Sequence, residues 1–194
     1  MRVWGVGGGP SLQGYRFESL RQEHVIAVNG SYRDVPWAQH IIFSDRRFWQ
    51  WNHMHPVWQD FTGRKITTWQ HNVFPGCEVW QSYVTGPLST RPGMLAGKDS
   101  GTKAVNLAVL LGATRIELLG FDMKPNGNYH DYHELKNRQN SYGKFVEAFE
   151  AMGQQVLARG IRVTNWCADS GATVYERRDW RDAIPSERGE HPAA

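Results

Sequence analysis

The sequence predicts an α/β protein with a mostly parallel sheet flanked by helices. Two observations lead to this fold class. Short apolar runs alternate with segments of helical periodicity, which is typical of parallel sheets. Most of these runs end in glycine or small polar residues, as strands do where their carboxyl ends meet a binding site. With 194 residues, the chain has room for one such domain and too little for two ordinary ones.

The N-terminal half of the chain predicts four strands joined by short helices. The strands are expected at residues 2–6, 24–28, 41–43 and 65–69. A short helix is expected at 17–21, and one continuous helix at 46–58. Residues 70–98 contain several Gly and Pro residues without clear periodicity, and this pattern predicts a long loop.

The C-terminal half predicts two helices, each followed by a strand. The first helix is expected at 103–111, with Ser100 as its N-cap and Gly112 as its stop. The second is amphipathic and is expected at 142–159, with Leu157 among its core-facing residues and Gly160 as its stop. Strands follow at 116–119 and 161–165, and a polar loop is expected at 124–137.

Composition excludes several classes of protein. Charged residues make up 21% of the chain and the formal net charge is +3, without the Lys/Arg run of a nucleic-acid-binding tail. Cys77 and Cys167 form no CxxC-type motif, so neither a disulfide framework nor a Cys-based zinc site is expected. No stretch approaches the roughly 18 apolar residues of a membrane span, and the N-terminus lacks the apolar region of a signal peptide. These features predict a cytoplasmic protein.

The tryptophans allow two interpretations. Five of the nine lie between residues 37 and 69. Such residues serve either core packing or an aromatic platform for a base or sugar ring.

The segment after the first strand is rich in glycine. It consists of Gly7, Gly8, Gly9, Pro10 and Ser11. Glycine permits a tight turn that presents backbone N–H groups to a phosphate, and the serine hydroxyl adds a donor or a helix cap. The segment lacks both the Lys-Ser/Thr ending of a P-loop and the full GxGxxG spacing of a dinucleotide-binding loop. We therefore predict phosphate binding here, with a tight turn that binds no ligand as the alternative.

Polar residues at other strand and helix ends extend this predicted site. Asn29 follows the second strand, where it either contacts a ribose or base or stabilises a turn. Asp45 follows the third, where it either holds a ribose hydroxyl or caps the next helix. Ser100 and Gly101 open a helix whose free N–H groups form a second predicted anion site, although capping alone also explains Ser100.

A cluster of titratable residues follows Asp122, which ends a strand. His130 and His133 are candidates for a general base, because the pKa of histidine lies near the operating pH. Together with Asp131 or Glu134, the same histidines could instead hold a divalent metal. The remaining interpretation is an exposed polar loop.

Four segments together resemble a known group of families. They are Gly7–Leu12, Val28-Asn29, Ser100-Gly101 and Leu118–Asp122. They are similar to motifs of the sialyltransferase-like Rossmann families. These include the bacterial CMP-sialic-acid transferases and the domain shared by motility accessory proteins and 6-hydroxymethylpterin diphosphokinases. The resemblance covers roughly residues 2–165, and this chain looks like the small stand-alone members found in phage and prophage genomes.

The resemblance implies a role for each matching residue. Gly8, Gly9, Pro10 and Ser11 would lie along the nucleotide phosphate, with Asn29 near the sugar or phosphate. Ser100 and Gly101 would contact the nucleotide from the opposite side, and Asp122 would lie near the nucleotide or a metal. His130 or His133 would deprotonate the acceptor hydroxyl. The chain departs from the families in its shortened lid segment and in the absence of a clear pair of phosphate-binding tyrosines.

These observations lead to three functional hypotheses. The first is a sialyltransferase-like transferase with a nucleotide-sugar donor of the CMP type, which needs no metal or other cofactor and acts on an acceptor that the sequence does not specify. The second is a Mg²⁺-dependent pyrophosphokinase-like enzyme with Asp45, Asp122 and Asp131 as carboxylates. The third is a non-catalytic nucleotide-binding phage protein, either nucleotide-sensing or virion-associated. If the chain is phage-encoded, the cytoplasm predicted for it is that of the host. We assign residues 1–177 to a single nucleotide-binding Rossmann-like domain and residues 178–194 to a flexible tail.

Overall fold

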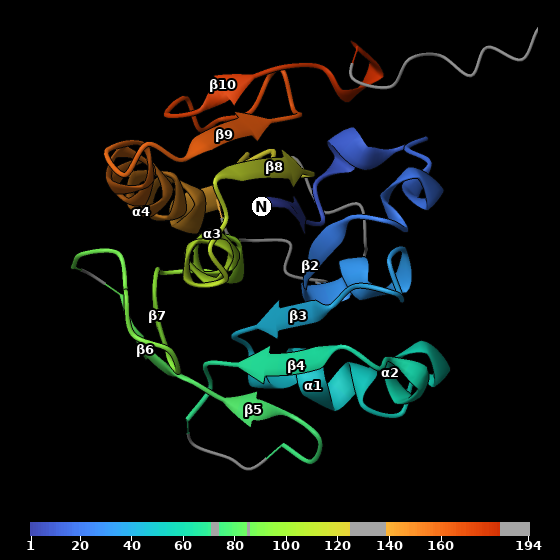
Figure 1. Ribbon diagram of the computed structural model, residues 1–194. Coiled ribbons are helices and arrows are strands. Elements are labelled where there is room, and N and C mark those ends of the chain that lie inside the picture. The colour runs from blue at the N-terminus through green and yellow to red at the C-terminus, as the bar shows by residue number, and fades with distance from the viewer. Residues whose placement is uncertain (71–73, 85, 125–138, 183–194) are drawn as a thin grey trace, which may run out of the picture.

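The computed structural model describes residues 1–70, 74–84, 86–124 and 139–182, with backbone only for 139–142. Its centre is one parallel sheet of eight strands (Figure 1). In spatial order the strands are β10 (Glu176–Arg177), β9 (Arg162–Asn165), β8 (Arg115–Leu119), β1 (Arg2–Val6), β2 (His24–Val28), β3 (His40–Phe43), β4 (Arg64–Thr67) and β5 (Glu78–Val79). Every pairing in this sheet is parallel, which confirms the predicted α/β class.

The order of the strands creates a switch point beside β1. The chain runs from β1 outward through β2, β3 and β4 to β5, and then returns to β8 on the other side of β1. The connections after β1 and β8 therefore leave the sheet in opposite directions. In open parallel sheets a crevice forms at such a point, outside the carboxyl ends of the strands.

Helices cover both faces of the sheet. One face carries α3 (Ser100–Leu110) and α4 (Gln139–Leu157) (Figure 1). The other carries the short 3-10 helices η2 (Phe17–Leu20) and η3 (Asn29–Arg33), together with α1 (Arg46–Asn52) and α2 (Pro56–Asp60). Short 3-10 turns also occur at Pro10–Leu12 (η1) and Trp180–Asp182 (η4).

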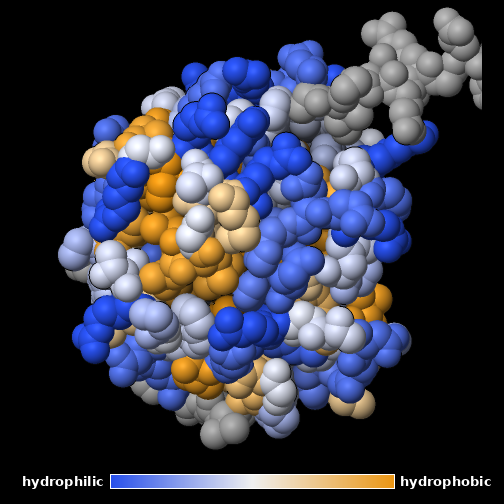
Figure 2. Space-filling model, viewed as in Figure 1, coloured by the Kyte–Doolittle hydropathy of each residue, from blue (hydrophilic) through white to orange (hydrophobic). Residues whose placement is uncertain are grey.

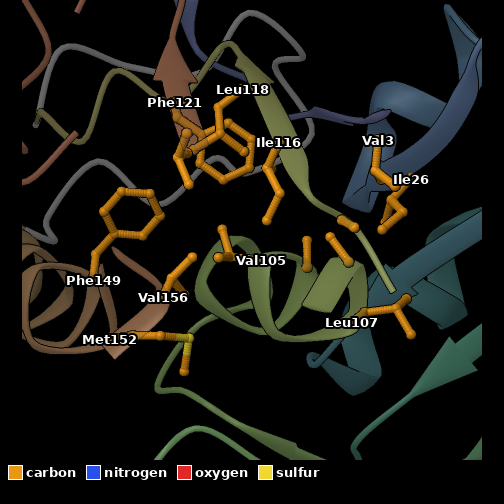
Figure 3. Close-up of a cluster of buried hydrophobic side chains, with 14 of the residues drawn as sticks. Val3, Ile26, Val105, Leu107, Ile116, Leu118, Phe121, Phe149, Met152 and Val156 are labelled. Atoms are coloured by element: carbon orange, nitrogen blue, oxygen red, sulfur yellow. The ribbon is translucent and has the colours of Figure 1, made fainter. Parts of the chain in front are cut away.

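Each face of the sheet has its own apolar core. On the α3–α4 face, Val105 and Val156 point toward the sheet residues Ile116 and Leu118 (Figure 3). The core on the opposite face is rich in aromatic side chains and includes Trp58, which is buried. Trp37 and Trp49 pack against that core, so packing explains these three tryptophans. The surface seen in Figure 2 is largely hydrophilic, with an apolar area near its centre.

Two predicted elements of the N-terminal half differ from the structure. The single helix expected at 46–58 is two helices, because the ring of Pro56 cannot continue α1 and instead starts α2. The loop expected at 70–98 contains three short strands: β5, β6 (Gln81–Tyr83) and β7 (Met94–Ala96). Strands of two or three residues are too short to produce a periodic pattern in the sequence.

The C-terminal helices correct two further expectations. Asp99, and not Ser100, is the N-cap of α3, since its carboxylate accepts a hydrogen bond from the Thr102 N–H at 3.0 Å. Gly112 follows α3 with φ 83°, as its predicted stop requires. Leu157 was expected to face the core, yet it is exposed at the end of α4. Within the described residues, no helix is long and apolar enough to cross a membrane.

Candidate functional site

The candidate site lies at the switch point, where the segments after β1, β2 and β8 meet the start of α3. Ser31 fixes two of these segments, because its hydroxyl donates to Val6 O at 2.6 Å and accepts from the Val28 N–H at 2.9 Å. The carboxyl ends of β1 and β2 are thereby held together. This edge of the sheet carries most of the predicted site residues: the glycine-rich loop and, from other segments, Asn29, Ser100, Gly101 and Asp122.

The glycine-rich loop is braced by the segment after β8. The Gly7 N–H donates to Leu119 O at 2.7 Å, and the Gly9 N–H donates to Gly120 O at 2.9 Å. A Cβ atom on Gly9 would lie 1.9 Å from Asp122 Oδ2, and one on Gly7 would lie 2.5 Å from Gly120 O. Close packing against the β8 segment therefore requires glycine at both positions, independently of any ligand.

Asp122 completes the brace through Ser11. Its carboxylate accepts a hydrogen bond from the Ser11 N–H at 3.0 Å and another from the Ser11 hydroxyl at 2.5 Å. Both donors of Ser11 are thus occupied by Asp122. The Asp122 carbonyl also accepts from the Gly171 N–H at 2.7 Å, which ties the loop to the segment after β9. In this arrangement Asp122 positions the glycine-rich loop.

Three polar groups near the switch point keep unused hydrogen-bonding capacity. They are the Gly8 N–H, the side-chain amide of Asn29 and the hydroxyl of Ser100, none of which forms a hydrogen bond within the described ranges. Asn29 also adopts φ 53°, a left-handed conformation that is uncommon outside glycine. Strained backbone of this kind concentrates at binding sites, where the fold holds a side chain in a fixed direction. These groups can receive the polar atoms of a ligand.

Gly101 and Asp45 have structural explanations. A Cβ atom on Gly101 would lie 3.0 Å from Asp99 Oδ1 and 3.1 Å from Phe121 Cε1, so the packing of the helix start favours glycine. The Asp45 carboxylate caps α1 by accepting from the Arg47 N–H at 2.8 Å, and it also pairs with the Arg47 side chain. Of the two roles expected for Asp45, capping is the one that the contacts account for.

Two carboxylates of the metal-dependent hypothesis, Asp45 and Asp122, follow strands that are not neighbours in the sheet. Asp122 follows β8 and Asp45 follows β3, and two strands lie between these elements in the sheet. Neighbouring strands are about 4.8 Å apart, so the two segments are separated by about 14 Å, too far for one Mg²⁺ ion to bind both. No group of three or more potential metal ligands occurs in the described part of the chain. Asp131 lies outside it, as do the base candidates His130 and His133.

A cluster that the sequence analysis missed lies at the same edge of the sheet, beyond the ends of β3 and β4. Lys103, in the first turns of α3, is buried with 5% of its surface exposed. Its ammonium group donates to the hydroxyl of Thr68 at 2.8 Å and to that of Ser44 at 3.2 Å. These two residues follow β4 and β3, so the lysine reaches from the helix to the carboxyl ends of both strands.

The electrostatic environment of Lys103 is unusual for a lysine. Burial lowers the pKa of its ammonium group to about 8, and the nearby charge of Asp99 opposes this shift. Burial also raises the pKa of Asp99, which faces the same region. Lysines with a lowered pKa at the carboxyl end of a sheet are candidates for functional residues. In the sequence, the only indication of this lysine cluster was that Asp99 and Lys103 are spaced by about one helical turn.

The fold defines a Rossmann-like α/β protein, with a candidate binding site at the strand ends. Comparison with protein-family models and with curated proteins finds no match. Among solved structures, the chain is similar to the sialyltransferase CstII from Campylobacter jejuni, determined with a substrate analogue, cytidine-5'-monophosphate. The TM-score is 0.53 at 14% sequence identity, over 91% of this chain and 84% of CstII. The chain therefore has a sialyltransferase-like fold.

Proposed function

We propose that this chain is a transferase that uses a nucleotide-activated donor, in a sialyltransferase-like glycosyl transfer from a CMP-type donor. The observation that carries the proposal is the set of unused polar groups at the switch point: the Gly8 N–H, the Asn29 amide and the Ser100 hydroxyl. They surround the place where open parallel sheets bind ligands. The similarity of the fold to CstII adds support.

The chemistry of the proposed transfer is a direct displacement. A histidine, His130 or His133, removes the proton of the acceptor hydroxyl as its oxygen attacks the anomeric carbon of the donor sugar. The bond between that carbon and the phosphate oxygen breaks, and its electron pair leaves with the nucleotide phosphate. The Gly8 N–H and the N-terminal end of α3 stabilise the charge that develops on the departing phosphate. No step of this reaction requires a metal ion.

Ligand binding tests the proposal first. We expect CMP to raise the unfolding temperature by mass action, to the same extent with and without Mg²⁺, in a screen that also includes UDP, GDP and ATP. Asn29→Gly keeps the positive φ available but removes the amide. It should weaken CMP binding about tenfold or more without changing stability in the absence of ligand. Stabilisation only by ATP with Mg²⁺ would favour pyrophosphoryl transfer, and no response to any nucleotide would contradict nucleotide binding.

Activity tests the catalytic part. The release of CMP from CMP-sialic acid is measured with His130→Ala, with His133→Ala and with the unmodified chain. We expect one of the two variants to lose activity by about 10²-fold or more while it still binds CMP, because general-base catalysis contributes about that much. If both variants release CMP as fast as the unmodified chain, neither histidine is the general base. Nucleotide binding without any CMP release would favour the non-catalytic binding protein.

A further inference from the structure

The hydrogen bonds around Lys103 leave two donors unused. The ammonium group has three N–H donors, of which two reach Thr68 and Ser44. Thr68 directs its own hydroxyl hydrogen to Ser44 Oγ at 3.0 Å, so Ser44 accepts twice. One N–H of Lys103 and the hydroxyl hydrogen of Ser44 have no acceptor in the part of the chain that the structure describes. The cluster can therefore donate two further hydrogen bonds to a bound group.

The positive charge of Lys103 also lacks a direct counterion. No carboxylate within the described segments forms an ion pair with it. The negative charge of Asp99 acts on Lys103 without a direct contact. The Asp99 carboxylate instead accepts hydrogen bonds from the N–H and hydroxyl of Thr102 at the start of α3. Hydroxyl groups solvate a buried ammonium but do not neutralise it. A buried cation without a direct ion pair is costly even when a carboxylate lies nearby, and ionisable groups in such surroundings are candidates for a function.

The cluster is reachable and lies apart from the glycine-rich loop. Ser44, which carries one of the unused donors, is only partly buried, whereas Lys103 is buried. The sheet order places β3 and β4 two and three strands away from β1. At about 4.8 Å per strand, the cluster lies roughly 10 to 14 Å from the loop. A group bound here is thus distinct from a phosphate held at the loop.

We propose that Lys103 and Ser44 form a second anion-binding subsite, which holds a carboxylate or phosphate group of the ligand beyond the ends of β3 and β4. Two unused donors, one of them charged, match two oxygen atoms of a single oxyanion. Thr68 positions the ammonium group by accepting one of its hydrogens. The subsite deepens the proposed function and rests on it only for the identity of the molecule that carries the anion.

Direct observation of Lys103 tests the subsite. The signals of ¹³Cε-labelled lysine are followed while sodium phosphate, sodium acetate or CMP is added at constant ionic strength, and Lys103→Met identifies the Lys103 signal. We expect a saturable shift of this signal with at least one probe and none of comparable size for the exposed Lys144. A response to acetate alone identifies a carboxylate, and a response to phosphate or CMP identifies a phosphate. No saturable shift with any of the three probes would overturn the proposal.

The variants separate binding from a structural role. Lys103→Met should weaken the binding of the effective probe about 10- to 100-fold, with Lys144→Met as the matched control. Its unfolding temperature should be unchanged or higher at pH 7, because methionine fills a similar volume without a buried charge. A variant that loses stability but keeps its anion affinity would assign Lys103 a structural role only. If Lys103→Met fails to fold, Lys103→Arg identifies the Lys103 signal in its place, because arginine removes the lysine signal but keeps the charge, and the titrations of the unmodified chain then decide.

The same data distinguish this subsite from the proposed function. A shift of the Lys103 signal by phosphate or acetate, with no nucleotide binding in the thermal screen, would support the subsite and contradict the transferase. CMP that binds while the Lys103 signal responds to none of the probes would support nucleotide binding and overturn the subsite.

Discussion

Gly9 lies in the candidate site, and the packing of the fold alone already restricts which residue can occupy its position. Its N–H donates to Gly120 O, and the space above its Cα is filled by the carboxylate of Asp122. The same carboxylate holds both donors of Ser11. Glycine, serine and aspartate, which come from two distant segments of the chain, therefore form one interlocked unit. The shape of the glycine-rich loop depends on that unit.

Replacement of Gly9 tests the unit. Gly9→Ala should lower the free energy of unfolding by about 1–3 kcal/mol or more, because its Cβ would lie 1.9 Å from Asp122 Oδ2 and 2.7 Å from Gly120 O. Urea unfolding measures the change. In the Asp122→Ala background the same substitution should be less destabilising, since one of the two clashing groups is absent. Equal effects in both backgrounds would show that Asp122 does not restrict this position.

At the scale of elements, α4 shows that its two glycines have different reasons to be there. A Cβ on Gly143 would meet no atom within 4 Å, whereas one on Gly153 would lie 2.5 Å from Val174 Cγ1. Gly153 thus allows the close approach of α4 to the segment between β9 and β10. The helix is placed by this contact and by the buried residues Phe149, Met152 and Val156.

The two glycines predict opposite effects within one helix. Gly143→Ala should raise the free energy of unfolding by up to about 1 kcal/mol, because alanine has the higher helix propensity. Gly153→Ala should lower it by about 1–3 kcal/mol through the clash with Val174. Chemical denaturation of both variants provides the comparison, and Val174→Ala should relieve much of the second effect. A stabilising Gly153→Ala would contradict the close packing of α4 against Val174.

At the scale of the whole molecule, the two ends of the sheet have different character. The carboxyl ends of the strands carry the candidate site, with its polar and partly exposed groups. The amino ends of β2 and β3 instead bring the rings of His24 and His40 to within 5.3 Å of each other. Burial lowers the pKa of His40 to about 4, the charges of His24 and Arg64 act in the same direction, and Glu78 opposes them. His40 is thus neutral in the folded protein at pH values where it is protonated in the unfolded chain.

This difference predicts how stability depends on pH. The free energy of unfolding should fall by up to about 3 kcal/mol as the pH drops from 6.5 to 4, because the unfolded chain gains a proton on His40 that the folded protein excludes. The lowered pKa of His24 adds to the same trend. Unfolding curves across this range test it, and His40→Gln should flatten the dependence. An NMR titration in which folded His40 titrates near pH 6.5 would contradict the prediction.

Sequence patterning determined the fold class, because strands of four or five buried residues and long amphipathic helices produce clear periodicity. It located β2 at its observed bounds and placed the Gly7–Ser11, Asn29 and Asp122 positions at one edge of the sheet. It failed where elements are short, as at β5, β6 and β7, and where a proline divides a helix, as at Pro56.

Only the tertiary structure decided what the polar residues do. Asp45 caps a helix and Asp122 holds Ser11, although the sequence allowed ligand-binding roles for both. In the sequence, little distinguishes Lys103 from other helical lysines. The fold places its ammonium group against hydroxyl groups that follow two different strands. The physical reason is that burial patterns are local and repeat along the chain, so a sequence displays them. Hydrogen-bond partners far apart in sequence are chosen by the packing of the whole chain.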